Sequence, residues 1–279
     1  MYDTLTTEEL TALVKAVFSL KRTDHKLAFL LDVPDETVKD TDVWRIRRRM
    51  TKDWQQKLKS VKSGLNLDEV NIIFYPNVHS NNADLPETGY FYSEDIEDVS
   101  AENLKQKGLP VSLKDIMTTH QIFFALTQFS ATAPLKLLAP HYGFRAATMP
   151  GFTQEMLQSL KLDYEEINAR IMKIKHILDP ATGMEIEFQL DTGENHHIYF
   201  DLRFRTATSS GGRFPDPGKA GNLPGGECYI VPYEGEKGEQ SKSSGTLPVQ
   251  FENEIVIYKI EQNAAVDILS SGEHSNSEM

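Results

Sequence analysis

Apolar residues follow two different periods in the first 180 residues of the chain. The capping pattern Thr6-x-x-Glu9 precedes apolar residues at helical spacing. Two longer amphipathic helices are predicted over 41–61 and 163–178, the second with Asp163 as its N-cap. Short apolar runs predict strands at 26–31, 70–75, 122–126 and 145–149. This alternation predicts an α/β fold whose N-terminal half holds a mainly parallel sheet.

The pattern changes to strict alternation after residue 180. Residues 184–190 and 197–204 alternate apolar and polar side chains and are joined by a turn, which predicts a β-hairpin. Further strands are expected at 228–231, 254–260 and 264–269, and long loops at 80–101 and 206–224. The sequence thus predicts two domains, an α/β domain over 1–180 and a mostly β domain over 181–279.

Composition narrows the class of protein. The chain has 279 residues, of which 39% are apolar and 25% charged, as is ordinary for a soluble globular protein. Its net charge of 29 − 41 = −12 argues against general binding to nucleic acid or to anionic membranes. No apolar run reaches the length of about 18 residues that a membrane helix needs. A single cysteine, Cys228, favours a reducing compartment, and we expect a cytoplasmic protein.

One carboxylate stands in a distinctive setting. Glu227 follows the turn Asn222-Leu223-Pro224-Gly225-Gly226 and begins an apolar strand. Glycines allow close backbone approach, and a strand holds a carboxylate more rigidly than a loop does, as a metal ligand requires. The alternative is a surface turn with a solvated glutamate.

Several short blocks occur in the order found in the aminopeptidase T family, and the chain resembles that family from about residue 120 to 270. The blocks are the turn at Glu227, the segment Arg145-Ala146-Ala147-Thr148-Met149-Pro150-Gly151-Phe152-Thr153, and Gly245-Thr246-Leu247-Pro248. Members of the family are metal-dependent exopeptidases, and their relatives include an iron-dependent dihydroxypyridine dioxygenase. The resemblance implies hydrolysis of N-terminal residues from peptides by a metal-activated water, with zinc, cobalt or manganese as the divalent metal.

The resemblance also implies an incomplete metal site. Family members bind metal through a glutamate of the turn and then a second glutamate, two histidines and an aspartate, and only Glu227 has a counterpart here. We therefore expect a C-terminally truncated member with little or no peptidase activity by itself, a peptide or small-molecule substrate and a homodimeric assembly. Two alternatives stay open: a non-haem iron dioxygenase of the same fold, which needs two histidines and a carboxylate, and a non-enzymatic remnant or binding subunit.

Basic residues supply two further candidate sites. Arg203 and Arg205 lie two residues apart on the second hairpin strand, and in the family this region lies near the metal, so either could bind a substrate carboxylate. The alternative is a salt bridge to Glu185 or Glu187. The run Arg45, Arg47, Arg48 and Arg49 is interpreted as a solvated helix face, or alternatively as a site for an acidic partner.

Histidines offer no ligand pattern in the sequence. His196 and His197 are adjacent on a strand and therefore point to opposite faces, which makes a shared ion difficult. His120 and His141 are isolated, and His79 lies in a loop cluster without ligand spacing. Structural or surface roles are expected for all of them.

Overall fold

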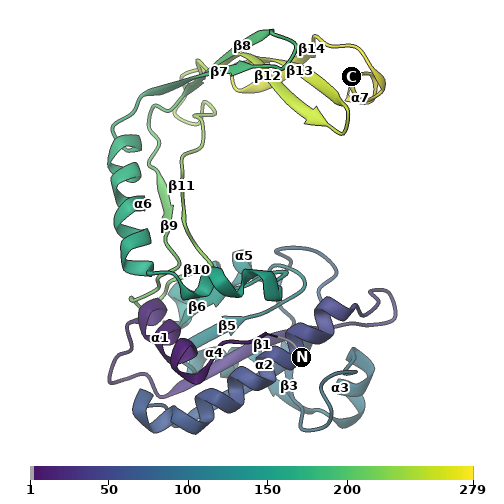
Figure 1. Cartoon of the computed structure of the whole chain (residues 1–279), viewed down its shortest axis with the longest axis vertical. Coiled ribbons are helices and arrows are strands. Elements are labelled where there is room, and N and C mark those ends of the chain that lie inside the picture. The colour runs from purple at the N-terminus through teal and green to yellow at the C-terminus, as the bar shows by residue number, and fades with distance from the viewer. Residues whose placement is uncertain (1–2, 279) are drawn as a thin grey trace. The chain divides into compact units, whose positions relative to one another are not determined.

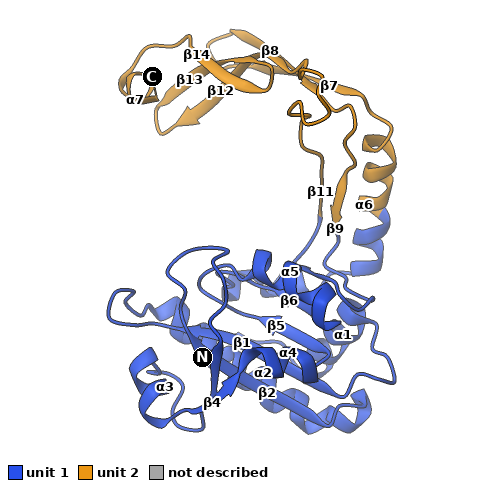
Figure 2. Ribbon diagram, turned by 180° about the vertical axis from the view of Figure 1, so that it is seen from behind, with its two compact units in different colours: residues 1–169, 210–226 blue, residues 170–209, 227–279 orange. Residues whose placement is uncertain are grey.

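β1 (Lys26–Val33) is the central strand of a seven-stranded sheet, and all but its first residue are buried. Such a strand needs apolar side chains on both faces, which the run Leu27-Ala28-Phe29-Leu30-Leu31 supplies. The structure, a computed structural model, describes residues 3–278 (Figure 1). Their contacts divide the chain into unit 1, residues 1–169 and 210–226, and unit 2, residues 170–209 and 227–279 (Figure 2).

The sheet of unit 1 is mainly parallel, as the sequence predicts. Its order is β10-β6-β5-β1-β2-β3-β4, and the first five strands run parallel while β3 and β4 are antiparallel. The other strands are β2 (Glu69–Pro76), β3 (Thr88–Phe91), β4 (Leu109–Ser112), β5 (Ile122–Ala125), β6 (Arg145–Thr148) and β10 (Ala220–Asn222).

Helices cover both faces of this sheet. Leu27, Phe29 and Leu31 point into a core shared with α1 and α2, whereas Ala28 and Leu30 point into a second core shared with α4 and α5. Successive side chains of a strand point to opposite faces, so one strand serves both cores. The helical segments of unit 1 are α1 (Thr7–Phe18), α2 (Asp42–Val61), η1 (Lys62–Leu65), α3 (Ala101–Lys107), α4 (Leu113–Thr119), α5 (Thr132–Tyr142) and η2 (Gln154–Lys161).

Helix starts in unit 1 follow local capping chemistry. The hydroxyl of Thr6 accepts from the Glu9 backbone N–H while the Glu9 carboxylate accepts from the Thr6 N–H, which confirms the predicted capping box of α1. Thr41 caps α2 through the N–H of Trp44. Asp163 accepts from the N–H groups of Glu165 and Glu166 before α6 (Tyr164–Leu178), which continues into unit 2.

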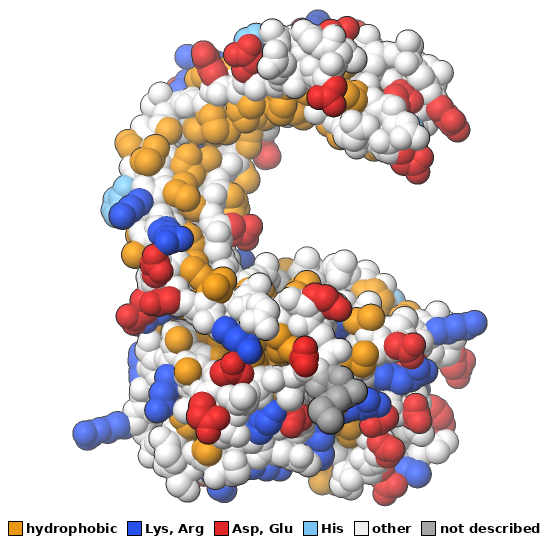
Figure 3. Space-filling model, viewed as in Figure 1, with side chains coloured by type: hydrophobic (Ala, Val, Ile, Leu, Met, Phe, Trp, Pro, Cys, Tyr) orange, Lys and Arg blue, Asp and Glu red, His pale blue; other side chains and the backbone are white. Residues whose placement is uncertain are grey.

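Unit 2 is built on a five-stranded antiparallel sheet of order β14-β13-β12-β8-β7. The predicted hairpin is confirmed as β7 (Gly183–Gln189) and β8 (Asn195–Asp201). Most side chains of β12 are only half-buried, and hydrophobic side chains are visible along this sheet in Figure 3. The remaining elements are β9 (Thr208–Ser210), β11 (Glu227–Tyr229), β12 (Ser244–Phe251), β13 (Glu254–Glu261), β14 (Ala264–Ile268) and α7 (Glu273–Glu278), with β9 paired to β11.

Two expectations differ from this fold. The predicted loop 80–101 contains β3, and the predicted loop 206–224 contains β9 and β10. β10 has only three residues, Ala220, Gly221 and Asn222, which pair with β6. Their composition is typical of a turn. The contacts separate the two units between Ala169 and Arg170 and return residues 210–226 to unit 1. The domain boundary at residue 180 stays a prediction.

The interpretation of the basic run as a solvated face is wrong for Arg47 and Arg48, which are 1% and 0% exposed. Arg48 donates to the carbonyls of Ile96 and Glu97 and to the carboxylate of Asp40. These acceptors lie in loops, so the helical spacing of the arginines does not predict the contacts. In the described part of the chain, no helix combines the length and the apolar composition that a membrane span requires.

Candidate functional site

The carboxyl ends of the parallel strands are where sheets of this type bind ligands, above all where the strand order reverses. In unit 1 the order reverses at β1, which has β2 on one side and β5 on the other. Asp32, near the end of β1, is fully buried there and accepts from the backbone N–H groups of Gln128 and Phe129 at 2.8 to 3.0 Å. The crevice between β1 and β5 is therefore filled by the chain itself.

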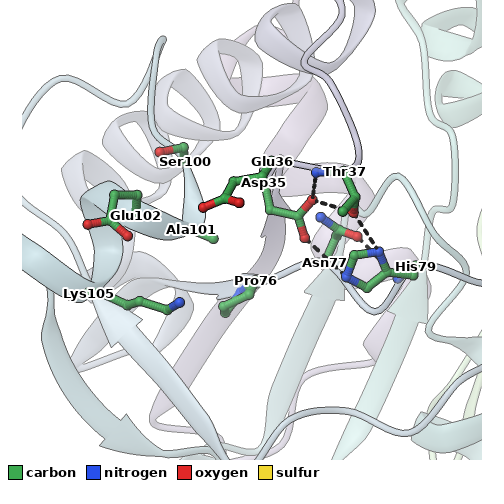
Figure 4. Close-up of a pocket in the computed structure, with 10 residues that line it drawn as sticks. All are labelled: Asp35, Glu36, Thr37, Pro76, Asn77, His79, Ser100, Ala101, Glu102 and Lys105. Atoms are coloured by element: carbon green, nitrogen blue, oxygen red, sulfur yellow. Dashed lines mark hydrogen bonds and ion pairs between the residues drawn. The ribbon is translucent and has the colours of Figure 1, made fainter.

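A pocket opens beside this crevice, where β1 and β2 end (Figure 4). It has a volume of about 590 Å³. Its walls are the loop after β1, the loop after β2 and the first turn of α3; they contribute Asp35, Glu36, Thr37, Pro76, Asn77, His79, Ser100, Ala101, Glu102 and Lys105. The N–H of Ala101 donates to the carbonyl of Pro34 at 2.9 Å, which ties α3 to the loop after β1.

Short side-chain turns shape two of these walls. Asp35 accepts from the N–H groups of Thr37 and Val38, each at 2.9 Å. Asn77 accepts from the N–H of His79 at 3.1 Å, and His79 adopts a left-handed backbone with φ 62°. Both are Asx-type turns, in which a short polar side chain replaces a backbone acceptor. They hold the loops in fixed conformations without a helix or strand.

The two loops meet through Asp35, Thr37 and His79. The Thr37 hydroxyl lies 3.1 Å from His79 Nδ1 and donates to Asp35 Oδ1 at 2.9 Å, and His79 Nε2 lies 3.1 Å from Asp35 Oδ2 (Figure 4). Partial burial raises the pKa of Asp35, but hydrogen bonds from Val38 and Thr37 and the nearby His79 outweigh it and leave that pKa below its usual value. Asp35 is therefore an anion at neutral pH.

Two of the three other charged side chains of the pocket make no polar contact with the described residues. Glu36 and Lys105 are exposed, and neither makes a hydrogen bond or ion pair with any other residue in 3–278. Both reach into the space between the loops and α3 (Figure 4). Among the described residues, Glu102 accepts from Gln106 alone, one turn further along α3. The residues that line the pocket thus carry three carboxylates, one ammonium, one imidazole, one side-chain amide and two hydroxyls.

Glu227, the predicted metal ligand, lies at the first position of β11 and is exposed. Its side chain contacts no polar partner within the described residues. The turn before it is built as the glycines suggest: a Cβ at Gly225 would collide with the backbone of Gly212, and the N–H of Gly226 donates to the Ser210 carbonyl at 2.8 Å. The close approach to Gly212 accounts for Gly225 without a metal, whereas a side chain at Gly226 would meet open space.

Arg203 and Arg205, the predicted substrate-binding pair, both lie beyond the end of β8 and bind carboxylates of unit 2. Arg203 donates to Asp201 and, at 2.6 Å, to Glu239, whereas Arg205 lies 2.9 Å from Glu236. The alternative expectation, a salt bridge to Glu185 or Glu187, is wrong. Because the strand ends at Asp201, period-two reasoning does not apply to these arginines. Substrate binding by either arginine stays a prediction.

Histidines and the cysteine have ordinary surroundings. His120 is buried and contacts Asn71 and the Ile116 carbonyl; burial lowers its pKa. His197 is exposed, His196 lies 3.2 Å from the Thr246 hydroxyl, and Cys228 is half-buried. Within 3–278, no three His, Cys, Asp or Glu side chains form a group that could hold a metal ion.

Sequence reasoning missed the pocket residues Asp35, Glu36 and Lys105, although a signal for part of the site existed. Asp35 and His79 each follow a predicted strand, and neighbouring parallel strands end at the same edge of a sheet. Combining those two facts would have paired the two loops. Lys105 gave no signal, because α3 follows the predicted loop 80–101 in a segment for which no helix or strand was predicted.

Comparisons with known proteins support the fold. No known protein family matches the chain, and no curated protein matches its sequence. The solved structure of 2,5-dihydroxypyridine dioxygenase from Pseudomonas putida KT2440 is similar, with 13% identity, a TM-score of 0.60, and coverage of 98% of this chain and 69% of that chain. AmpT from Thermus thermophilus has 9% identity and a TM-score of 0.48, with 94% and 70% covered. The likeness to the dioxygenase shows a shared mixed α/β fold with a separate antiparallel sheet.

Proposed function

We propose that this protein binds a small molecule carrying both a positively charged amine and an anionic group, such as a free amino acid or short peptide, in the pocket of unit 1. The observation that carries the proposal is the pair Glu36 and Lys105, which have opposite charges, reach into one pocket and have no partner among the described residues. Concave sites with a few convergent polar groups are the usual places of small-molecule binding.

Electrostatics favours the amine as the main anchor. Asp35, Glu36 and Glu102 outnumber Lys105, so the field in the pocket attracts a cation. Charged hydrogen bonds to an ammonium are about twice as strong as neutral ones. Lys105 then favours ligands whose second group is a carboxylate, and Thr37 and His79 add hydrogen-bonding groups nearby. The proposal corresponds to the binding role among the alternatives left open by the sequence.

Isothermal titration calorimetry with three forms of one dipeptide tests this assignment. The free dipeptide carries both charges, its N-acetylated form lacks the amine, and its C-amidated form lacks the carboxylate. We expect Glu36→Gln to weaken binding of the free and amidated forms about tenfold. We expect Lys105→Met to weaken binding of the free form but not of the amidated form.

The matched control is Glu185→Gln, an exposed glutamate of unit 2 that should leave all three affinities unchanged. Absence of binding to every form overturns the proposal. Equal losses for the free and amidated forms in Lys105→Met would show that Lys105 does not contact the carboxylate.

The metal-dependent aminopeptidase and dioxygenase functions stay predictions from the resemblance. Both need several donors around one ion, and the described side chains form no such group. Elemental mass spectrometry of the purified chain and of Glu227→Ala tests whether the protein holds a metal ion at Glu227. Near-stoichiometric metal that is lost in the variant would support a metal centre that includes Glu227.

A further inference from the structure

A second pocket of unit 1 has a charge pattern opposite to that of the first. It has a volume of about 410 Å³ and lies between α2, β2 and the segment after β3. Lys52 and Lys59 line it from one face of α2, and Lys107 lines it from the end of α3. Within 3–278, no aspartate or glutamate lines this lysine pocket, although the chain has a net charge of −12. Its field therefore favours anions.

The three ammonium groups are poorly neutralised. Lys52 and Lys59 make no hydrogen bond or ion pair with any other residue in 3–278. Lys107 lies 3.7 Å from Glu94, and both side chains are more than half exposed, so solvent screens the pair. Two ammonium groups thus lack a counterion, and the third is weakly paired.

Carboxylates of an adjoining groove do not supply the missing charge. Lys52 also lines that groove, together with Asp53 and Glu97. Asp53 binds Lys57 at 2.6 Å, and Glu97 binds Arg49 at 2.5 Å. The other two acidic residues of the groove are exposed, and solvent screens their charge. The charge of Lys52 therefore stays available to a ligand.

Repulsion between the lysines makes a bound anion favourable. Partial burial, followed by the charges of Lys52 and Lys62, lowers the pKa of Lys59. An anion between Lys52 and Lys59 would offset this repulsion, because it places an opposite charge beside both ammonium groups.

The floor of the lysine pocket is apolar. Ile72 and Phe74 lie on the same face of β2, and like Ile96 they are buried. The Tyr92 ring packs edge-on against Phe74, with 6.1 Å between the ring centroids. Leu109, which is 67% exposed, adds accessible apolar surface. A ligand that is only an ion would leave this surface without a partner.

We propose that the lysine pocket binds a small molecule in which an aromatic ring carries an oxyanion, either a carboxylate or a phosphate. The ring covers Tyr92 and Leu109, and the oxyanion lies between Lys52 and Lys59. Lysine binds either oxyanion as a point charge. Contacts between aromatic rings stabilise such a complex beyond the area that they bury, and the volume of the pocket suits a small ligand.

The lysine pocket is separate from the pocket at Asp35. Lys105 lines the pocket at Asp35, and Lys107 lines the lysine pocket. Two positions along a helix correspond to a rotation of about 200°, so the two side chains leave α3 on different sides. Anion binding in the lysine pocket therefore does not depend on amine binding in the first pocket.

Isothermal titration calorimetry with four probes tests the two requirements separately. 2-Naphthyl phosphate and 2-naphthoate carry a ring and an oxyanion, 2-naphthamide carries the ring without the charge, and inorganic phosphate carries the charge without the ring. At low ionic strength we expect each naphthyl anion to bind at least about tenfold more tightly than either of the other two probes. The tighter of the two naphthyl anions identifies the oxyanion as phosphate or carboxylate.

Substitution of the lysines tests the assignment to this pocket. Lys52→Gln and Lys59→Gln should each weaken binding of the tighter naphthyl anion about fivefold to tenfold and leave 2-naphthamide unaffected. Lys114→Gln is the matched control, because Lys114 is an exposed lysine of α4, on the opposite face of the sheet. Lys52→Gln should also leave the dipeptide affinities of the first pocket unchanged, so failure of one site is distinguishable from failure of the other.

A ¹³C NMR titration locates the ligand, and we expect the methyl signals of Ile72 and Ile96 to shift when the naphthyl anion is added. Methyl signals that do not move would overturn the assignment. Equal losses of affinity in the two lysine variants and in Lys114→Gln would overturn it as well. So would an affinity for 2-naphthamide or inorganic phosphate that equals the affinity for the naphthyl anions, or the absence of binding to every probe.

Discussion

Arg48 shows how single residues place charge inside the core of unit 1. Its side chain is fully buried, yet its guanidinium binds Asp40 and two backbone carbonyls. Arginine suits this role because it offers five donors in a planar fork that matches carboxylates and carbonyls. Arg145 is used in the same way, paired with Asp24 and the Phe18 carbonyl.

Removal of Arg48 should therefore be costly. We expect Arg48→Ala to lower the free energy of unfolding by about 3–5 kcal/mol, because Asp40 and the carbonyls would lose a buried partner. Arg45 also binds Asp40 but is about 38% exposed, and Arg45→Ala should cost less than about 1 kcal/mol. Urea denaturation of both variants checks the contrast, and equal losses would contradict it.

Asp32 should make the free energy of unfolding fall as pH rises, whereas most carboxylates make it increase with pH. Burial raises its pKa from 3.8 to about 6 on folding, so between those values the folded protein binds more protons than the unfolded chain. The stability contributed by protonated Asp32 is complete below pH 3.8 and is lost as pH rises through 6.

Relative to Asp32→Asn, the original protein should lose about 2 kcal/mol of unfolding free energy between pH 4.5 and pH 7.5. Denaturant titrations at the two pH values measure this difference. The difference in unfolding free energy between the two proteins could also stay constant with pH, or shift in favour of the original protein at pH 7.5. Either result is incompatible with a raised pKa of Asp32.

At the scale of elements, the sequence predicts most helices and strands of unit 1 but not all partners of its sheet. β1 and β2 are long apolar runs between turn residues, so their local pattern suffices. β10 is only Ala-Gly-Asn, and it becomes a strand because β6 offers a free edge beside it. Such a strand depends on contacts more than 70 residues apart along the chain, which local periodicity cannot report.

The segment after β8 is held by an arginine network together with the buried side chain of Leu202. Asp201 accepts from Arg203 and from the N–H of Lys242, and the hydrogen bonds from Arg203 lower the pKa of Asp201 to about 2 despite burial. Arg203→Lys would lose the planar fork that reaches both Asp201 and Glu239.

We therefore expect Arg203→Lys to lower the thermal midpoint of unit 2 while leaving ligand binding in unit 1 unchanged. Differential scanning calorimetry together with dipeptide titration measures both quantities. Weakened ligand binding with an unaltered midpoint would restore Arg203 as a substrate-binding residue.

At the scale of the whole molecule, the two units have separate cores of very different size. Unit 1 encloses large apolar clusters on both faces of its sheet, whereas few side chains of the unit 2 sheet are buried, among them Ile198, Val256 and Ile260. Burial of apolar area is the main stabilising contribution. Unit 2 should consequently be the less stable part.

Two thermal transitions are expected, the lower one from unit 2. Ile260→Ala, in the core of unit 2, should lower only the first midpoint, and Leu58→Ala, in the core of unit 1, only the second, each at a cost of about 2–5 kcal/mol. Differential scanning calorimetry of both variants measures the two midpoints. One transition that both variants shift equally would show that the units unfold together.

We place the functional site in unit 1, at the carboxyl ends of β1 and β2. Chemical-shift mapping by ¹⁵N NMR during titration with a free dipeptide tests it most directly. We predict shifts confined to the three walls of the pocket, at residues 35–37, 77–79 and 100–105. Shifts at Arg203, Arg205 and Glu227, with an unchanged pocket, would contradict the account and place the site in unit 2.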